Sequence, residues 1–215
     1  IKKEERDLIE AIRERARRRE EMEAKQKREN PRKPYILQAR QQIASLQLSG
    51  DEKTILALAN APPADAKTAI VPNFVTESAY TENLQTRNKV GDIQSRVRPA
   101  LVNVQTGEWK WVEFEEDKKD RPVQMSNLAA WNEDGSRLAM IAESTDNKHR
   151  WIVAIDLATA KAKSLAHDED KAWIGGPGMN TLGWLAGGKD LYFQSERTGW
   201  SHLYTVSSEG GEQKA

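Results

Sequence analysis

The chain has 215 residues, with 33 Lys or Arg and 33 Asp or Glu, so its formal net charge is zero. A balanced charge gives no general field to attract nucleic acid or an anionic membrane, and we expect neither partner. The absence of cysteine excludes disulfides, zinc–thiolate sites and cysteine nucleophiles, and no apolar run reaches the roughly 18 residues of a membrane-spanning helix.

Residues 1–34 are predicted to form a charged helix that is set apart from the rest of the chain. Leu8, Ile12 and Ala16 lie four residues apart, which gives the first half of the helix one apolar stripe. The pair Asn30-Pro31 ends the pattern, because the residue before a proline disfavours α geometry. We expect the first half to be docked and the second half to be solvated.

Two other hypotheses exist for this helix. Its arginines could form a nucleic-acid arm, but the interleaved glutamates cancel the field that phosphate binding needs. The helix could instead be a docking arm for a partner or for a second subunit, and both ideas rest on Arg15, Arg17, Arg18 and Arg19.

From residue 42 the hydrophobic period becomes strand-like. Residues 128–144 predict a strand, a turn at Glu133-Asp134-Gly135 and a second strand, because Asp-Gly between apolar runs is a strong hairpin signal. Residues 150–166 predict another pair of strands with a turn near Ala158-Thr159.

This pattern recurs along the chain. Trp184 follows Trp131 by 53 residues, and Gly188 follows Gly135 by the same 53. Similar features open the segment 43–60, with a turn at Gly50-Asp51. The matching closing part is delayed to 98–114, with a turn at Thr106-Gly107, so 61–97 is predicted to be an inserted loop.

A repeat of about 50 residues with four strands is typical of a β-propeller blade. The predicted fold class is therefore mainly β, with residues 35–215 forming a partial β-propeller behind the charged helix, which we expect to be an insertion between blades. The blades fall at approximately 42–114, 126–170 and 179–215. About three blades do not close a ring, and the chain starts within a helical pattern, so we expect a piece of a longer protein.

Residues 195–204 place a serine, a histidine and an acid close together. A hydrolase nucleophile elbow needs Gly-x-Ser-x-Gly between a strand and a helix, but Leu203 replaces the last glycine and a strand pattern follows. We therefore predict no nucleophile at Ser201 and interpret the segment as a polar turn between blade strands. Glu196 and Arg197 are expected to hold this turn, and Trp200 and Tyr204 to pack between blades.

The remaining polar clusters are assigned no chemistry. Residues 166–170 put His167 beside three acids, but consecutive turn residues seldom supply metal-ligand geometry, so we predict a solvated interblade loop, no metal and no cofactor. His149 lies in a predicted polar turn, and Gly175–Gly178 in a flexible loop that lacks the Lys-Ser/Thr of a phosphate loop. Glu115 and Glu116 could hold a cation or an amine, although an exposed acidic loop is favoured.

Three segments resemble the dipeptidyl peptidase IV branch of the prolyl oligopeptidase family of serine peptidases. LYFQSERTGWSHLY (191–204) resembles its Ser-Glu-x-x-Gly-aromatic-x-His-Leu-Tyr blade turn, and WNEDGSRLAM (131–140) resembles its Trp–Asp-Gly strand turn. Residues 89–108 are similar to the segment that returns from a mobile excursion into a blade strand. The resemblance covers roughly residues 40–215.

The resemblance implies a propeller that limits access to peptides and helps to bind them. Peptide hydrolysis would be done by the protein's own C-terminal α/β-hydrolase domain, whose Ser–Asp–His triad has no counterpart in this chain, so no catalytic residue is assigned. The resemblance also implies a periplasmic or secreted bacterial enzyme and allows a homodimer. Trp173 and Asn180 are the substrate-binding residues that it suggests.

Two features depart from the family pattern. The Asp-Trp-x-Tyr-Glu-Glu context that holds a substrate's free amine is absent, and the charged helix stands in its place. The loop after Trp173 reads Ile-Gly-Gly-Pro-Gly where the family carries a substrate-facing Phe-Arg pair. These departures put the release of dipeptides in doubt, and a non-catalytic propeller that binds a protein partner is the alternative function.

Overall fold

The computed structural model describes residues 2–30, 34–63, 67–89, 91–93, 95–118 and 120–215. It divides into two compact units, Ile1–Ile36 and Leu37–Ala215, which are treated separately. The first unit holds helix α1 (Lys2–Glu29), which ends just before Asn30 as predicted. The stripe residues Leu8 and Ile12 are exposed, and the docking of this half stays a prediction.

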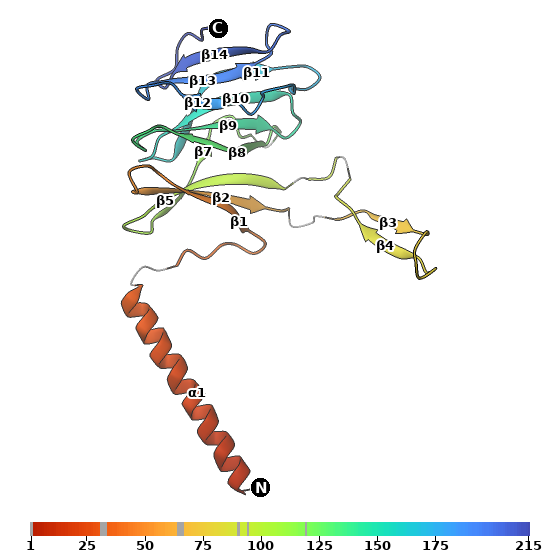
Figure 1. Cartoon of the computed structure of the whole chain (residues 1–215), viewed down its shortest axis with the longest axis vertical. Coiled ribbons are helices and arrows are strands. Elements are labelled where there is room, and N and C mark those ends of the chain that lie inside the picture. Colours follow the sequence, from red (N-terminus) through yellow and green to blue (C-terminus); the bar gives the residue numbers. More distant parts are fainter. Residues whose placement is uncertain (1, 31–33, 64–66, 90, 94, 119) are drawn as a thin grey trace. The chain divides into compact units, whose positions relative to one another are not determined.

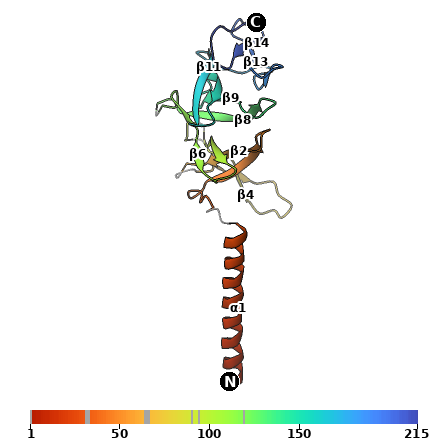
Figure 2. The ribbon, with the colours of Figure 1, turned by 90° about the vertical axis from the view of Figure 1, so that its left-hand side faces the viewer.

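The second unit is built from mainly antiparallel sheets that follow one another in a stack (Figures 1 and 2). The first sheet has the order β1-β2-β5-β6, with β1 (Gln42–Leu48), β2 (Thr54–Ala61), β5 (Arg96–Asn103) and β6 (Trp109–Trp111). The second has the order β7-β11-β10-β9-β8, with β7 (Glu113–Phe114), β8 (Val123–Trp131), β9 (Leu138–Ser144), β10 (His149–Ile155) and β11 (Lys161–Glu169). The third has β12 (Leu182–Trp184), β13 (Asp190–Ser195) and β14 (His202–Ser207).

The second sheet is buried on both faces, and its sequence shows why. Along β9, Leu138 and Met140 belong to a core shared with the first sheet, whereas Ala139 and Ile141 belong to a core shared with the third. Successive side chains of a strand point to opposite faces, so a strand between two sheets must be apolar at every position. The run Leu-Ala-Met-Ile-Ala meets this requirement, and β8 contacts both β5 and β12.

The mainly β fold and the predicted hairpins are confirmed. Strands β8 and β9 enclose the turn at Gly135, which has a φ of 72°, and β10 and β11 enclose the turn at Asp156–Ala160. Tyr204 is buried in the core that the second and third sheets share, which agrees with its predicted packing between blades.

Two stretches of chain differ from the predicted elements. The segment 61–97 is more than a loop, because β3 (Ile70–Asn73) and β4 (Glu82–Gln85) pair as a hairpin within it. Residues Glu113–Phe114 do not continue the first sheet; they form β7, which pairs in parallel with β11 of the second.

Two other predictions are wrong. Residues 166–170 are not a solvated loop, since β11 extends to Glu169. The polar end of β11 extends beyond the apolar core and still pairs with β10. Trp200 does not pack between blades; it is 77% exposed. It lies at the tip of the β13–β14 turn, beyond the last strand pair, Ser195 and His202.

Candidate functional site

A hollow of about 530 Å³ opens where the second and third sheets meet. The ends of β10, β11 and β13 form its floor, and the loop 170–179 together with the β13–β14 turn forms its walls. Its lining residues are Arg150, Asp168, Glu169, Asp170, Trp173, Ile174, Gly175, Gly176, Pro177, Met179, Gln194, Ser195, Glu196, Arg197 and Gly199. The hollow therefore joins an aromatic rim to a strongly polar floor.

A buried ion pair forms the centre of the floor. Arg150 Nη2 lies 3.2 Å from Asp168 Oδ2, and their side chains are only 3% and 11% exposed. The same guanidinium donates to the carbonyl oxygens of Met179, at 2.8 Å, and Gln194. Burial lowers the pKa of Arg150 and the Asp168 carboxylate opposes that shift; the group stays protonated, because arginine does not deprotonate in proteins.

Arg197 adds a second positive charge to this centre. Its Nη2 lies 2.7 Å from Asp168 Oδ1, and its Nε donates to Ser195 Oγ at 3.1 Å. Ser195 in turn donates to Asp168 Oδ1 at 2.9 Å. Arg197 also lies over the ring of Tyr204, 4.7 Å from its centroid. The prediction that Arg197 holds the turn is confirmed, and the turn is fixed to the neighbouring sheet.

The loop 170–179 is held at both ends. The Asp170 carboxylate accepts hydrogen bonds from the backbone N–H groups of Ala172 and Trp173, and Ile174 N–H donates to the carbonyl of Asn147 at 2.6 Å. Gly176 has a φ of 104°, and a Cβ there would stand 2.3 Å from the Glu196 carboxylate. The positive φ of Gly176 explains the glycine at that position. The predicted interblade loop is present and is anchored by these hydrogen bonds, and its flexibility stays a prediction.

The residues singled out from the sequence are divided between the hollow and its surroundings. Trp173 lines the hollow and is 73% exposed, whereas Asn180 is exposed and lies outside the lining. Ser201 accepts a hydrogen bond from Gln194 and donates to the carbonyl of Pro177 at 3.2 Å, so its hydroxyl supports the loop. Glu116 pairs with Arg121 at 2.7 Å.

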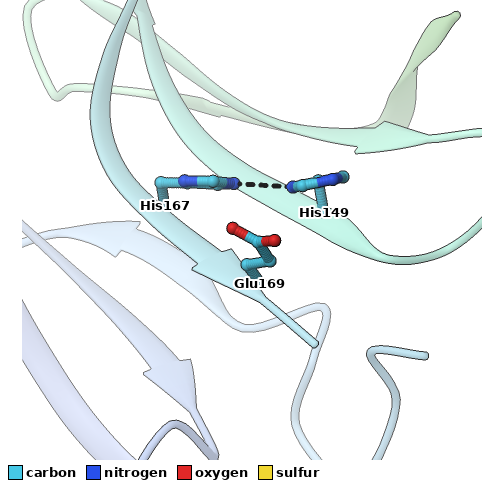
Figure 3. Close-up of side chains that lie close together, drawn as sticks. All are labelled: His149, His167 and Glu169. Carbon is cyan, nitrogen blue, oxygen red and sulfur yellow. Dashed lines mark hydrogen bonds between the residues drawn. The ribbon is translucent and has the colours of Figure 1, made fainter. Parts of the chain in front are cut away.

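A second cluster lies at the same end of the β10–β11 ladder as the hollow, on the other face of the strands (Figure 3). His149 Nδ1 and His167 Nε2 are 3.1 Å apart, and the ligand atoms of His149, His167 and Glu169 all lie within 4.8 Å of one another. Burial, followed by the neighbouring His149, lowers the pKa of His167. The sequence pattern points to His167 and the acids beside it, but not to His149 as their partner, because both histidines are predicted to lie in loops.

Comparison with known proteins identifies the fold. The family model described as the dipeptidyl peptidase IV (DPP IV) N-terminal region matches residues 49–215. A crystal structure of Porphyromonas gingivalis dipeptidyl peptidase 4 matches with a TM-score of 0.61 and 19% identity, covering 78% of this chain and 23% of the other. The chain thus spans less than a quarter of that enzyme and shares the fold of that part.

Two further structures match more weakly. The β-propeller domain of the Trilobed protease from Pyrococcus furiosus has 10% identity and a TM-score of 0.44, with 81% of this chain and 42% of the other covered. TolB from Acinetobacter baumannii has 18% identity and a TM-score of 0.41, with 83% of this chain and 33% of the other covered.

Helix α1, the helix among the described residues, is too polar to cross a membrane.

Proposed function

The chain belongs to the family of dipeptidyl peptidase IV N-terminal regions, and we propose that it is the propeller part of a serine peptidase that resembles dipeptidyl peptidase IV. In this proposal the propeller admits and holds the peptide substrate. A C-terminal α/β-hydrolase domain with a Ser–Asp–His triad cleaves it, and the enzyme works in the periplasm or outside the cell.

The observation that carries this proposal is the hollow beside Trp173. Binding pockets combine apolar surface with a few fixed polar groups, and this hollow has both. Trp173 offers an exposed ring, while the Asp170 and Glu196 carboxylates line the hollow around a buried Arg150–Asp168 centre. Exposed carboxylates accept hydrogen bonds from peptide N–H groups or from a free amine, and the indole packs against an apolar substrate side chain.

The test uses the full-length gene product that carries this chain. A fluorogenic Xaa-Pro peptide measures turnover, and a serine-directed fluorophosphonate reports the nucleophile separately. In the Trp173→Ala variant we expect KM to rise several-fold with kcat nearly unchanged, because lost uniform binding raises KM alone. Trp200→Ala is the matched control, since Trp200 is equally exposed but lies outside the lining, and it should keep the wild-type KM.

Each outcome separates the proposal from its alternative. Fluorophosphonate labelling with an unchanged KM in Trp173→Ala would retain a serine peptidase and reject the hollow as its peptide site. A full-length protein that is neither labelled nor active would reject the peptidase. The non-catalytic propeller that binds a protein partner would then be the function to pursue.

A further inference from the structure

We propose that His149, His167 and Glu169 bind a divalent transition-metal ion, with Zn²⁺ as the best match. The site lies at the end of the β10–β11 ladder, next to the hollow, and does not depend on the proposed peptidase function. Figure 3 shows the two imidazoles meeting through their nitrogens, with the Glu169 carboxylate directed toward the gap between them.

The strand register brings the three ligands to one face. His149 pairs directly with Glu169, and Trp151 pairs with His167. Side chains two residues apart on a strand share a face, so His167 and Glu169 stand together on β11 with His149 opposite. The ladder supplies this placement without any contribution from the exposed loops.

The distances suit a small tetrahedral ion. Zn²⁺ binds imidazole nitrogens at about 2.0–2.1 Å. For an ion about 2.05 Å from two nitrogens that are 3.1 Å apart, the nitrogen–ion–nitrogen angle is about 98°, which is near the tetrahedral angle. The Glu169 oxygen lies within 4.8 Å of both nitrogens, and it must come to about 3.3 Å from each nitrogen to share a tetrahedral ion with them. Glu169 is exposed, so rotation of its side chain supplies this movement.

The donor set decides which class of ion fits. Imidazole nitrogens favour Zn²⁺, Cu²⁺ and Ni²⁺, whereas Mg²⁺ and Ca²⁺ prefer oxygen ligands. Both facing nitrogens must present lone pairs, so the proton of the present His149–His167 hydrogen bond moves to the other nitrogen of its own ring. Three protein ligands leave a fourth position open to water.

Stacking on a buried tryptophan orients His167 before any ion binds. Its ring stacks on Trp151, with centroids 5.0 Å apart and planes 5° from parallel. Trp151 is itself buried and is packed edge-on by Phe114 at 5.6 Å. His167 is therefore oriented by a buried side chain, which lowers the entropy cost of ordering it when an ion binds.

The histidine content of the chain gives a direct test. The chain has three histidines, and the third, His202, is exposed on β14, outside the cluster. We would titrate the untagged full chain with ZnCl₂ and follow the imidazole NMR signals, with calorimetry for stoichiometry. One Zn²⁺ should bind per chain and shift the signals of His149 and His167 while that of His202 stays unchanged.

Variants make the assignment specific. His149→Phe and His167→Phe keep an aromatic ring for stacking but remove a ligand nitrogen, and each should weaken Zn²⁺ binding about tenfold or more. Glu169→Gln should weaken it by less, and His202→Phe should leave it unchanged; circular dichroism verifies the fold of each variant. Zn²⁺ binding that survives both histidine variants would overturn the proposal. So would no saturable binding by the wild-type chain at millimolar Zn²⁺.

Discussion

Gly50 and Gly135 bring the hairpin turns of two neighbouring sheets into backbone contact. A Cβ atom on Gly135 would stand only 2.5 Å from the backbone nitrogen of Gly50 and 2.6 Å from that of Asp51. The third sheet approaches the second in a similar place through a side chain, because a Cβ on Gly188 would lie 3.1 Å from the side-chain Nδ2 of Asn132. The glycines of the sequence repeat therefore serve two purposes, forming each turn and letting adjacent blades approach along this edge.

Gly135→Ala should lower the free energy of unfolding by more than about 2 kcal/mol. The left-handed φ of 72° costs a residue with a Cβ about 1–2 kcal/mol, and the clash with an immobile backbone adds to that. Gly187→Ala is the matched control, since its φ is 88° and its Cβ would meet nothing within 4 Å. Urea denaturation measures both, and equal losses would show that the turns are not in contact.

Trp184→Phe should lower the free energy of unfolding by about 1 kcal/mol, the net value of one hydrogen bond. Trp184 Nε1 donates to the carbonyl of Ala130 at 2.9 Å, which joins the third sheet to the second. Phenylalanine keeps much of the ring packing but cannot donate. Trp200→Phe, at the exposed turn tip, controls for the exchange of rings. Thermal unfolding compares the two, and an unchanged Tm for Trp184→Phe would mean that this bond contributes nothing to sheet docking.

The blade pattern could be predicted because its signals are local. The Asp134-Gly135 turn and the apolar runs on either side of it specify the β8–β9 hairpin within about 15 residues of sequence. The repeat of Trp131 and Gly135 at Trp184 and Gly188 then indicates equivalent strands. The apolar run of β9 is enough to predict a strand, but not that both of its faces are buried.

The site clusters could not be predicted, because they depend on strand register. His149 meets His167 only because of the register between β10 and β11. In this register Ile155 pairs with Ala162 and His149 pairs with Glu169, with an irregularity between Ile152 and Val153. A shift of one residue would turn one histidine to the opposite face. Arg197 pairs with Asp168 of a different sheet, and no local sequence pattern predicts a contact between residues of two sheets.

Asp168→Ala should be strongly destabilising, by about 3–5 kcal/mol, because it leaves the buried Arg150 charge without its partner. Arg197 would lose the same partner but is partly exposed and can turn toward water. Glu108→Ala is the control, since it breaks a Glu108–Lys110 pair at the surface, where such pairs are worth at most about 1 kcal/mol. Similar urea midpoints for the two variants would contradict the assigned role of Asp168.

Glu143→Gln should stabilise the protein increasingly as the pH rises from 4 to 7. Glu143 is partly buried on β9, where burial raises its pKa above the ordinary 4.5 and the opposing charge of Arg150 only partly offsets this. A carboxyl whose pKa is raised by folding favours the native state below pH 4.5, and that contribution is lost as the pH rises through its folded pKa. Glutamine carries no charge, so it avoids this loss, while Arg150 keeps Asp168 as its partner. Urea midpoints at pH 4, 5.5 and 7 measure the difference, with the exposed Glu115→Gln as the control; a wild-type advantage that grows with pH would show that the Arg150 charge outweighs burial.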